Sequence, residues 1–409
     1  VEFGPRIFDN TTDAWQLTGG VRGDFDVRGN NWRWDFNTSY GSYHNSEEQR
    51  GYPHLVRINA ALNGCPAGSP LGPVGPSGAP TACVPFNPFG YGNITQPQIN
   101  YIEAKAQVRE TNIVMQTAQA SITGDAFDIW AGPVAFAAGV EYRSLDYSNI
   151  PGEAQQTGAL LGANSAGPVN GSFDVAEAFG ELRIPLLAEM PFVEYLGIEA
   201  GYRYSDYANS AGNSFATDTW KLGAEWEPTD YLRFRVQAQQ AVRAPSVGEL
   251  FTTRATGFPS VGTTVDPCNF NSAQRTGANA TQVRALCAAQ SAAIANDPNW
   301  RSAGAQFRTV SGGNPNLDPE TATTYTYGFV LSAPEFFPNA MQSLTLTVDY
   351  WDIEIENVIS SVGFATSLSR CYDPVYNPNF TVNNAFCQNL FRDPATGYLT
   401  NTGIDGYIS

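Results

Sequence analysis

The six cysteines are the residues whose spacing points most directly to a chemical role. When an even number of cysteines falls in pairs, each pair within one long segment between predicted strands, local disulfides in an oxidising compartment are expected. Such a bond closes a loop of roughly 20 residues and contributes about 3 kcal/mol against disorder of that loop. We therefore predict three disulfides, joining Cys65 to Cys83, Cys268 to Cys287, and Cys371 to Cys387.

The remaining polar residues give little support to metal or catalytic chemistry. No CxxC motif occurs, and the only histidines, His44 and His54, fall in one predicted loop without an oriented partner. The carboxylates are scattered, and the chain has neither a Walker loop nor a dinucleotide-binding glycine pattern. A formal net charge of −17 argues against nucleic acid as a partner. The sequence thus predicts a protein that is not an enzyme and that needs no metal or cofactor.

The elements that must hold these loops are strands, because apolar and polar residues alternate along the chain. In the segment 219–227, two tryptophans and a leucine fall on one side, and a lysine and glutamates fall on the other. A period of two places neighbouring side chains on opposite faces of a strand. We predict ten strands, with ends good to ~2–4 residues, and the start of an eleventh near residue 399. The ten lie at 13–25, 32–44, 111–125, 133–147, 173–185, 193–207, 216–227, 231–242, 319–332 and 343–357.

One face of this sheet is rich in aromatic residues, and the other is charged. In a soluble β-sandwich, which is the alternative interpretation, a second layer would have to bury the apolar face. A barrel with lipid outside and a wet or plugged lumen inside accounts for both faces. A spanning helix is not expected, because it needs ~20 apolar residues and the longest weakly polar run, 129–140, is broken by glycine and proline.

The connections between the strands alternate in length. Those after the odd-numbered strands are short, and those after the even-numbered strands are mostly long. Outer-membrane barrels have short periplasmic turns and long extracellular loops, so the long connections are predicted to be extracellular. Within the longest of them, apolar residues at helical spacing predict a helix over Thr281–Ile294 that docks through Cys287.

Four strings in the strands and at their ends are specific in combination. They are FDIWAGPVAFAAGVEYR at 127–143, VRAPSVGELF at 242–251, NPNLDPETATTYTYGF at 314–329 and LTVDYWDIEIENVI at 346–359. Together they resemble the barrel domain of TonB-dependent outer-membrane receptors. Thr326 departs from the family pattern, which often has Glu before the glycine of that strand, and this difference does not affect the predicted fold.

The resemblance implies a barrel of about 22 strands, filled by an N-terminal plug that follows a short box contacting TonB. Neither plug nor box is visible, and the chain stops within an apparent strand. We therefore expect residues 1–409 to be a single partial β-barrel domain without the plug, the TonB box and the final strands. The expected fold is all-β, an antiparallel transmembrane outer-membrane barrel with long disulfide-bearing extracellular loops. Its expected partners are outer-membrane lipid, the protein's own plug, the TonB complex and a small solute.

The charged face is predicted to line the lumen. Most of its charges are expected to pair across strands, and a minority to contact the plug. The residues chosen for these roles are Arg33, Glu141, Arg143, Arg203, Arg233 and Arg235.

The resemblance implies active, TonB-dependent import of a nutrient that binds to the extracellular loops and the lumen. Aromatic loop residues could stack on a ligand or pack the loops against one another. Few basic residues occur in the loops, which disfavours a highly anionic ferric chelate and favours an oligosaccharide or other neutral solute. An iron-chelate (siderophore) receptor and a passive porin are the alternatives. The candidate ligand-binding aromatics are Phe86, Phe89, Tyr91, Trp300, Tyr372 and Tyr376.

Overall fold

One antiparallel sheet dominates the structure, a computed structural model that describes residues 3–27, 29–75, 78–258, 266–302, 306–334 and 344–399. Each strand pairs with its neighbour in the sheet order β1-β2-β3-β4-β5-β6-β7-β8-β11-β12. All ten predicted strands are present. Their bounds are β1 Ile7–Val27, β2 Asn30–Arg50, β3 Gln107–Ile129, β4 Gly132–Ile150, β5 Val169–Met190, β6 Val193–Asn209, β7 Ser214–Thr229, β8 Leu232–Arg243, β11 Glu320–Ser332 and β12 Thr345–Glu356.

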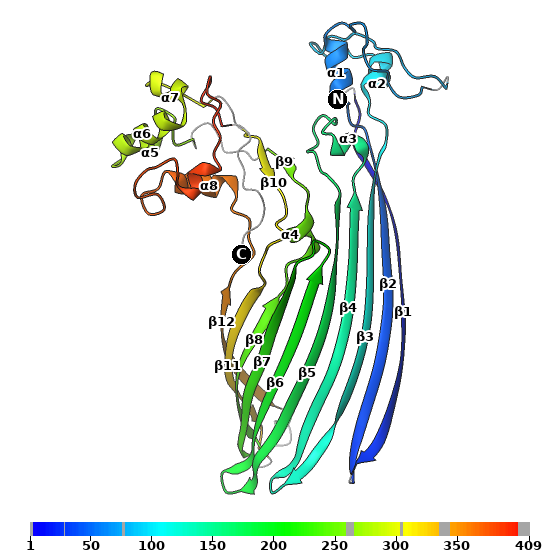
Figure 1. Ribbon diagram of the computed structural model, residues 1–409, viewed down its shortest axis with the longest axis vertical. Helices are drawn as coiled ribbons and strands as arrows, with labels where there is room; N and C mark the ends of the chain where they lie inside the picture. Colours follow the sequence, from blue (N-terminus) through cyan, green and yellow to red (C-terminus); the bar gives the residue numbers. More distant parts are fainter. Residues whose placement is uncertain are drawn as a thin grey trace.

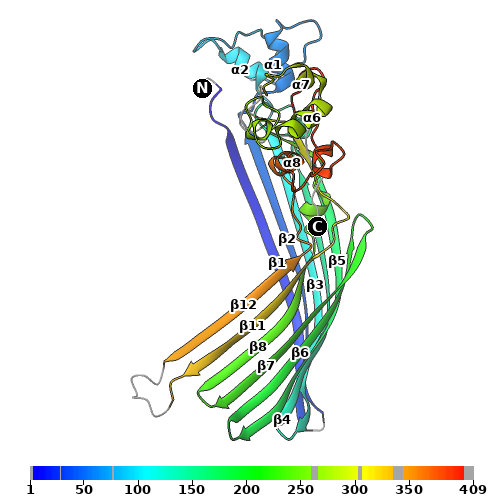
Figure 2. The same cartoon turned by 90° about the vertical axis from the view of Figure 1, so that its left-hand side faces the viewer.

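The sheet forms a curved, open wall (Figures 1 and 2). Within the described residues, β1 pairs only with β2 and β12 only with β11, so the wall is not closed into a ring. The eleventh strand predicted near residue 399 falls almost wholly outside the described residues.

The period-two alternation produces two chemically distinct faces, because directly opposed residues of neighbouring strands point to the same side. The apolar face carries aromatic pairs across strands, such as Trp15 on Tyr40 with ring centroids 5.2 Å apart and Trp226 on Phe234 at 5.4 Å. No second layer of the described residues covers this face: Val140 is 56% exposed. The opposite side, which we call the charged face, carries rows of arginine, lysine and carboxylates.

Several strands are longer than predicted, and β3 reaches 23 residues. The prediction ended each strand where the apolar side turned polar, but the backbone ladder continues beyond that point. Ile7 still pairs with Arg50 and Asp9 with Glu48, and the Arg50 guanidinium donates to Asp9 at 3.0 Å. β1 and β2 therefore project beyond the apolar band.

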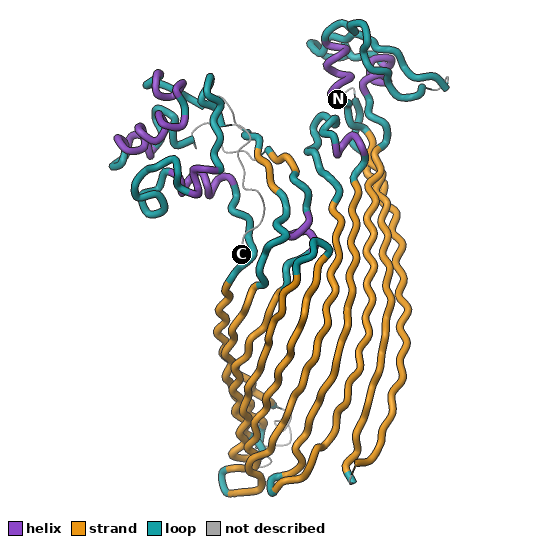
Figure 3. Tube along the Cα trace, in the orientation of Figure 1, coloured by secondary structure: helices purple, strands orange, loops and turns teal. Residues whose placement is uncertain are grey.

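The connections gather by length at opposite ends of the wall, as predicted (Figure 3). β3 and β4 are joined only by residues 130–131, and β7 and β8 only by residues 230–231. The long connections lie at the other end, apart from the short β6–β7 connection at 210–213. Most of the β11–β12 connection is outside the described residues.

Short helices and a small two-stranded sheet occur in the long loops. The predicted helix over Thr281–Ile294 is two helices, because Ser291 has an extended backbone and ends one helix while it begins the next. The loop elements are α1 Leu55–Leu62, α2 Gln96–Ile102, α3 Glu153–Gln156, α4 Val247–Phe251, β9 Ala255–Gly257, α5 Ala273–Thr276, α6 Ala280–Gln290, α7 Ala292–Asn296, β10 Thr309–Ser311, α8 Phe364–Cys371 and α9 Ala385–Gln388.

None of the helices in the described ranges has the length and apolar character needed to cross a bilayer.

Candidate functional site

Ion pairs cover the charged face of the wall. The Arg235 guanidinium binds both carboxylate oxygens of Asp349, at 2.9 and 2.6 Å. Glu177, with a side chain only 4% exposed, accepts hydrogen bonds from Arg203 at 2.9 Å and Ser205 at 2.7 Å. Each charged-face residue chosen from the sequence has such a partner: Arg33 with Asp24, Glu141 with Arg143, Arg203 with Glu177, Arg233 with Glu225 and Glu227, and Arg235 with Asp349.

A shallow cavity of about 360 Å³ lies within this face, across β5, β6, β7 and β8. Glycines make room for it: a Cβ at Gly223 would lie 2.9 Å from Glu199, and one at Gly197 would lie 2.2 Å from the Tyr195 hydroxyl. Arg183 lies over the Tyr195 ring and binds Glu225 at 3.1 Å. The cavity presents charges of both signs, and its three arginines, Arg183, Arg233 and Arg235, bind carboxylates. It therefore suits contact with a polar protein surface or a polar solute.

The motif at 242–251 fixes the base of the longest loop. Arg243, at the end of β8, binds Glu249 of α4 at 3.0 Å and Glu320, the first residue of β11, at 2.8 Å. Glu320 also accepts from the backbone N–H of Ile359, just after β12. Behind them, Leu250 and Phe251 pack with Phe173, which lies on the charged face of β5. Arg243 thus connects the bases of two long loops and holds α4 against the charged face.

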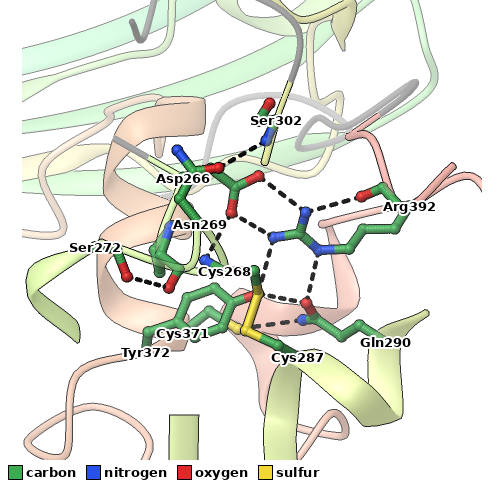
Figure 4. Close-up of polar contacts among 12 residues, drawn as sticks. Asp266, Cys268, Asn269, Ser272, Cys287, Gln290, Ser302, Cys371, Tyr372 and Arg392 are labelled. Atoms are coloured by element: carbon green, nitrogen blue, oxygen red, sulfur yellow. Dashed lines mark hydrogen bonds and ion pairs between the residues drawn. A yellow bond between two sulfur atoms is a disulfide. The ribbon is translucent and has the colours of Figure 1, made fainter. Parts of the chain in front are cut away.

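Beyond this base, the two loops share one core (Figure 4). The Asp266 carboxylate, from the β8–β11 loop, accepts from both terminal nitrogens of Arg392, from the segment after β12, at 2.8 and 2.9 Å. Neither side chain is exposed. Arg392 also donates to Gln290 and to the Tyr372 hydroxyl. Burial raises the pKa of that hydroxyl, so it stays protonated. We call this unit, residues 266–302 together with 364–399, the loop core.

The three predicted disulfides are present. They join Cys65 to Cys83, Cys268 to Cys287 and Cys371 to Cys387, with Cα–Cα distances of 5.7, 5.7 and 4.9 Å. The second and third belong to the loop core, where all four cysteines are buried. The remaining pair lies in the separate loop that contains α1 and α2.

The aromatic candidates from the sequence do not come together in one place. Trp300 and Tyr372 are buried in the loop core, 5% and 2% exposed, and Phe86 packs against the cluster beneath α1 and α2. Tyr376 contacts Arg370 and Phe386 at the surface. Phe89 and Tyr91 are more than three-quarters exposed. Trp300 and Tyr372, which are buried, and Phe86, which is partly buried, therefore have packing roles, and the other three remain accessible to a ligand.

Sequence reasoning missed two groups of loop residues. Nothing in the sequence relates Asp266 to Arg392, because they are 126 residues apart. His54 entered only as a possible catalytic or metal-binding residue, yet it lines a cavity together with Arg57 and Lys105. The spacing of three residues between His54 and Arg57, which places them on the same side of a helix, was the available signal.

Comparison with known proteins decides the family. The sequence model described as TonB dependent receptor-like, beta-barrel matches residues 2–406, nearly the whole chain. The chain belongs to this family. This match confirms the predicted family. TonB-dependent receptors are transport receptors that bind small solutes and TonB.

Solved structures of TonB-dependent receptors are similar to this chain at low identity. The siderophore receptor PirA from Acinetobacter baumannii is 11% identical over 93% of this chain and 40% of its own, with a TM-score of 0.40. The copper transporter OprC is 10% identical over 81% and 39%, with a TM-score of 0.37. The hemophore receptor HasR from Serratia marcescens is 11% identical over 84% and 46%, with a TM-score of 0.34. The chain thus spans less than half the length of these three proteins. No curated protein matches it.

Proposed function

We propose that this chain forms part of the barrel wall of a TonB-dependent importer in a bacterial outer membrane. The observation that carries the proposal is the family match over residues 2–406, on a sheet whose long loops lie at one end. In this role the apolar face contacts lipid, and the loops carrying the disulfides are extracellular. A strand crosses the hydrocarbon core in ~9–11 residues, so the longer strands would raise their loops well above the membrane.

The charged face would line the lumen and contact a plug domain of the same protein. Its ion pairs support this role, because paired charges keep a wall hydrated without attracting ions of one sign. The cavity at Gly197 and Gly223 is where a polar plug segment would fit most closely. Energy would come from TonB, through a segment that precedes the plug.

The solute we propose is an oligosaccharide or similar polar nutrient. The loops expose aromatic rings on which sugars stack. Phe89, Tyr91 and Tyr376 are the accessible rings. A siderophore receptor of the same family is the second candidate.

Uptake by cells tests the proposal. Deletion of the gene should abolish growth on the oligosaccharide when it is the limiting carbon source, and deletion of tonB should do the same. Growth that is unaffected by loss of tonB, together with steady ion conductance of the purified protein in planar bilayers, would instead establish a passive porin. A growth defect confined to iron limitation would establish the siderophore receptor.

A further inference from the structure

A cavity of about 310 Å³ lies under the loop that contains α1. Its walls come from the start of α1, from the segment 70–73, from the strand entry at 105–107 and from α3. Three cationic or titratable nitrogen side chains line it: His54, Arg57 and Lys105. Glu153 is the one carboxylate in the described lining. In a chain with a net charge of −17, this concentration of basic groups is unusual.

Arg57 is buried but poorly partnered. The residue is 7% exposed, and its hydrogen bond in the described structure goes from Nη1 to the Tyr101 carbonyl oxygen at 3.3 Å. No ion pair within 4.0 Å joins it to a carboxylate of the described residues. Burial lowers the pKa of Arg57, and this outweighs the attraction of Tyr101 and Glu103. The buried Arg392, in contrast, binds a carboxylate through two hydrogen bonds.

His54 adds a second unsatisfied group to the same cavity. Its Nδ1 atom is buried without a hydrogen-bond partner among the described residues. His54 is also the N-cap of α1, but its side chain makes no capping hydrogen bond. The N–H of Leu55, the first residue of α1, already donates to the Ala159 carbonyl oxygen at 2.7 Å, and the helix dipole favours a negative charge near the helix start. The start of α1 therefore attracts a negative charge, as Arg57 and Lys105 do.

Arg57 and His54 each have a buried nitrogen that could donate to an anion, and the exposed ammonium of Lys105 adds a positive charge beside them. A buried charge without a close counter-charge is destabilising, and arginine binds carboxylate and phosphate through paired hydrogen bonds. We propose that this cavity, which we call the Arg57 pocket, binds one carboxylate or phosphate group of the imported solute. The proposal rests on the proposed function, since it specifies the solute of that importer.

The surroundings define the rest of the solute. Thr157 also lines a neighbouring, larger cavity of about 810 Å³. That cavity presents the side-chain amides of Gln156, Asn164 and Gln306, the Phe258 ring, the cation Arg308 and, among the described residues, no carboxylate. Amides and an aromatic ring suit the hydroxyls and apolar faces of sugars. The two cavities together fit an oligosaccharide that carries one acidic sugar or one phosphate, and Glu153 would oppose a second negative charge.

Binding of defined probes to the full-length protein in detergent tests the pocket without TonB or transport. Calorimetry would compare a trigalacturonate with a neutral galactose trisaccharide, and glucose 6-phosphate with glucose. We expect the anionic member of at least one pair to bind at least tenfold more tightly. The trigalacturonate pair reports a carboxylate ligand, and the phosphate pair a phosphate ligand.

Two variants locate the binding. Arg57→Met keeps the side-chain length without the charge, and Lys105→Gln removes the charge of an exposed residue. Each should weaken binding of the anionic probe at least tenfold, whereas Arg284→Met, at an exposed position of α6 in the loop core, should leave that binding unchanged. Crystals soaked in selenate should show an anomalous peak between Arg57 and Lys105 in the wild type only.

Equal affinity for charged and neutral probes together with no selenate peak would overturn the proposal, as would binding that survives both variants. Failure of TonB-dependent growth with intact, Arg57-dependent binding would refute the importer and leave the pocket standing. Import that persists in a strain carrying Lys105→Gln without any change in anion affinity would refute the pocket and leave the importer standing.

Discussion

Two buried arginines show how differently a single residue type can act within these loops. Arg392 lies between two separate loops and binds Asp266, Gln290 and Tyr372, so its charge is compensated within the protein. Burial by itself would lower the pKa of Arg392, but Tyr372 and Asp266 hold it above its usual value. Its role is therefore structural, since these contacts join the β8–β11 loop to the segment after β12.

Replacing Arg392 with Met should destabilise the loop core by about 3–5 kcal/mol, because the Asp266 carboxylate would remain buried without a counter-charge. Hydrogen–deuterium exchange should show lost protection in both 266–302 and 364–399. A double variant that also carries Asp266→Asn should regain part of this protection. Arg370→Met is the control, because it removes only cation–π contacts with Tyr376 and Phe386, each worth ~0.5–1 kcal/mol. Unchanged protection in the Arg392 variant would show that the two loops are independent.

At the scale of elements, the strands could be predicted from the sequence and the loop contacts could not. Alternation is a local property, so the sequence alone assigns residues such as Trp226 and Phe234 to the correct face. Strand length is underestimated because residues near Arg50 are polar on both sides. In the loops, an aromatic residue has the same sequence signature whether it is buried like Trp300 or exposed like Tyr91. Only tertiary contacts distinguish them.

The close approach of β11 and β12 leaves no room for a side chain at Gly328. A Cβ at Gly328 would lie 2.4 Å from the Val348 carbonyl oxygen on β12, whereas at Gly180 the nearest atom would be 4.0 Å away. Gly328→Ala should therefore reduce the yield of folded, heat-resistant protein in detergent, and Gly180→Ala should not. The measurement is band shift on unheated gels. Equal yields for the two variants would show that β11 and β12 can separate without cost.

The disulfides should act within their own structural units. Removing the Cys268–Cys287 bond with paired serine substitutions should expose both halves of the loop core to trypsin, since both halves share one cluster of buried residues. The expected loss is about 3 kcal/mol. Removing the Cys65–Cys83 bond in the same way should leave cleavage of the loop core unchanged. Cleavage restricted to 266–302 in the first variant would contradict a shared core.

At the scale of the whole molecule, the two faces of the wall should tolerate charge very differently. Val140 and Gln119 lie on adjacent strands at nearly the same height, but on opposite faces: Val140 is opposite Ala120, and Gln119 is opposite Glu141. If the apolar face contacts lipid, Val140→Arg should cost ~2–4 kcal/mol and reduce insertion into liposomes.

Gln119→Arg is the matched control, because its added charge would face Glu141. It should insert like the wild type, as measured by protease protection of the strands. Equal insertion of both variants would refute the assignment of the apolar face to lipid.

The linkage between the two loops also has a consequence for the order of events during biogenesis. The disulfides close spans of 18, 19 and 16 residues, and short spans close at little entropic cost. Each bond can therefore be oxidised while its own loop is still isolated. The contact of Asp266 with Arg392 cannot precede the β11–β12 hairpin, because that hairpin brings the two segments together. Oxidation should thus come first and docking of the loop core last, so a thiol-blocking reagent would arrest maturation only when added before strand pairing.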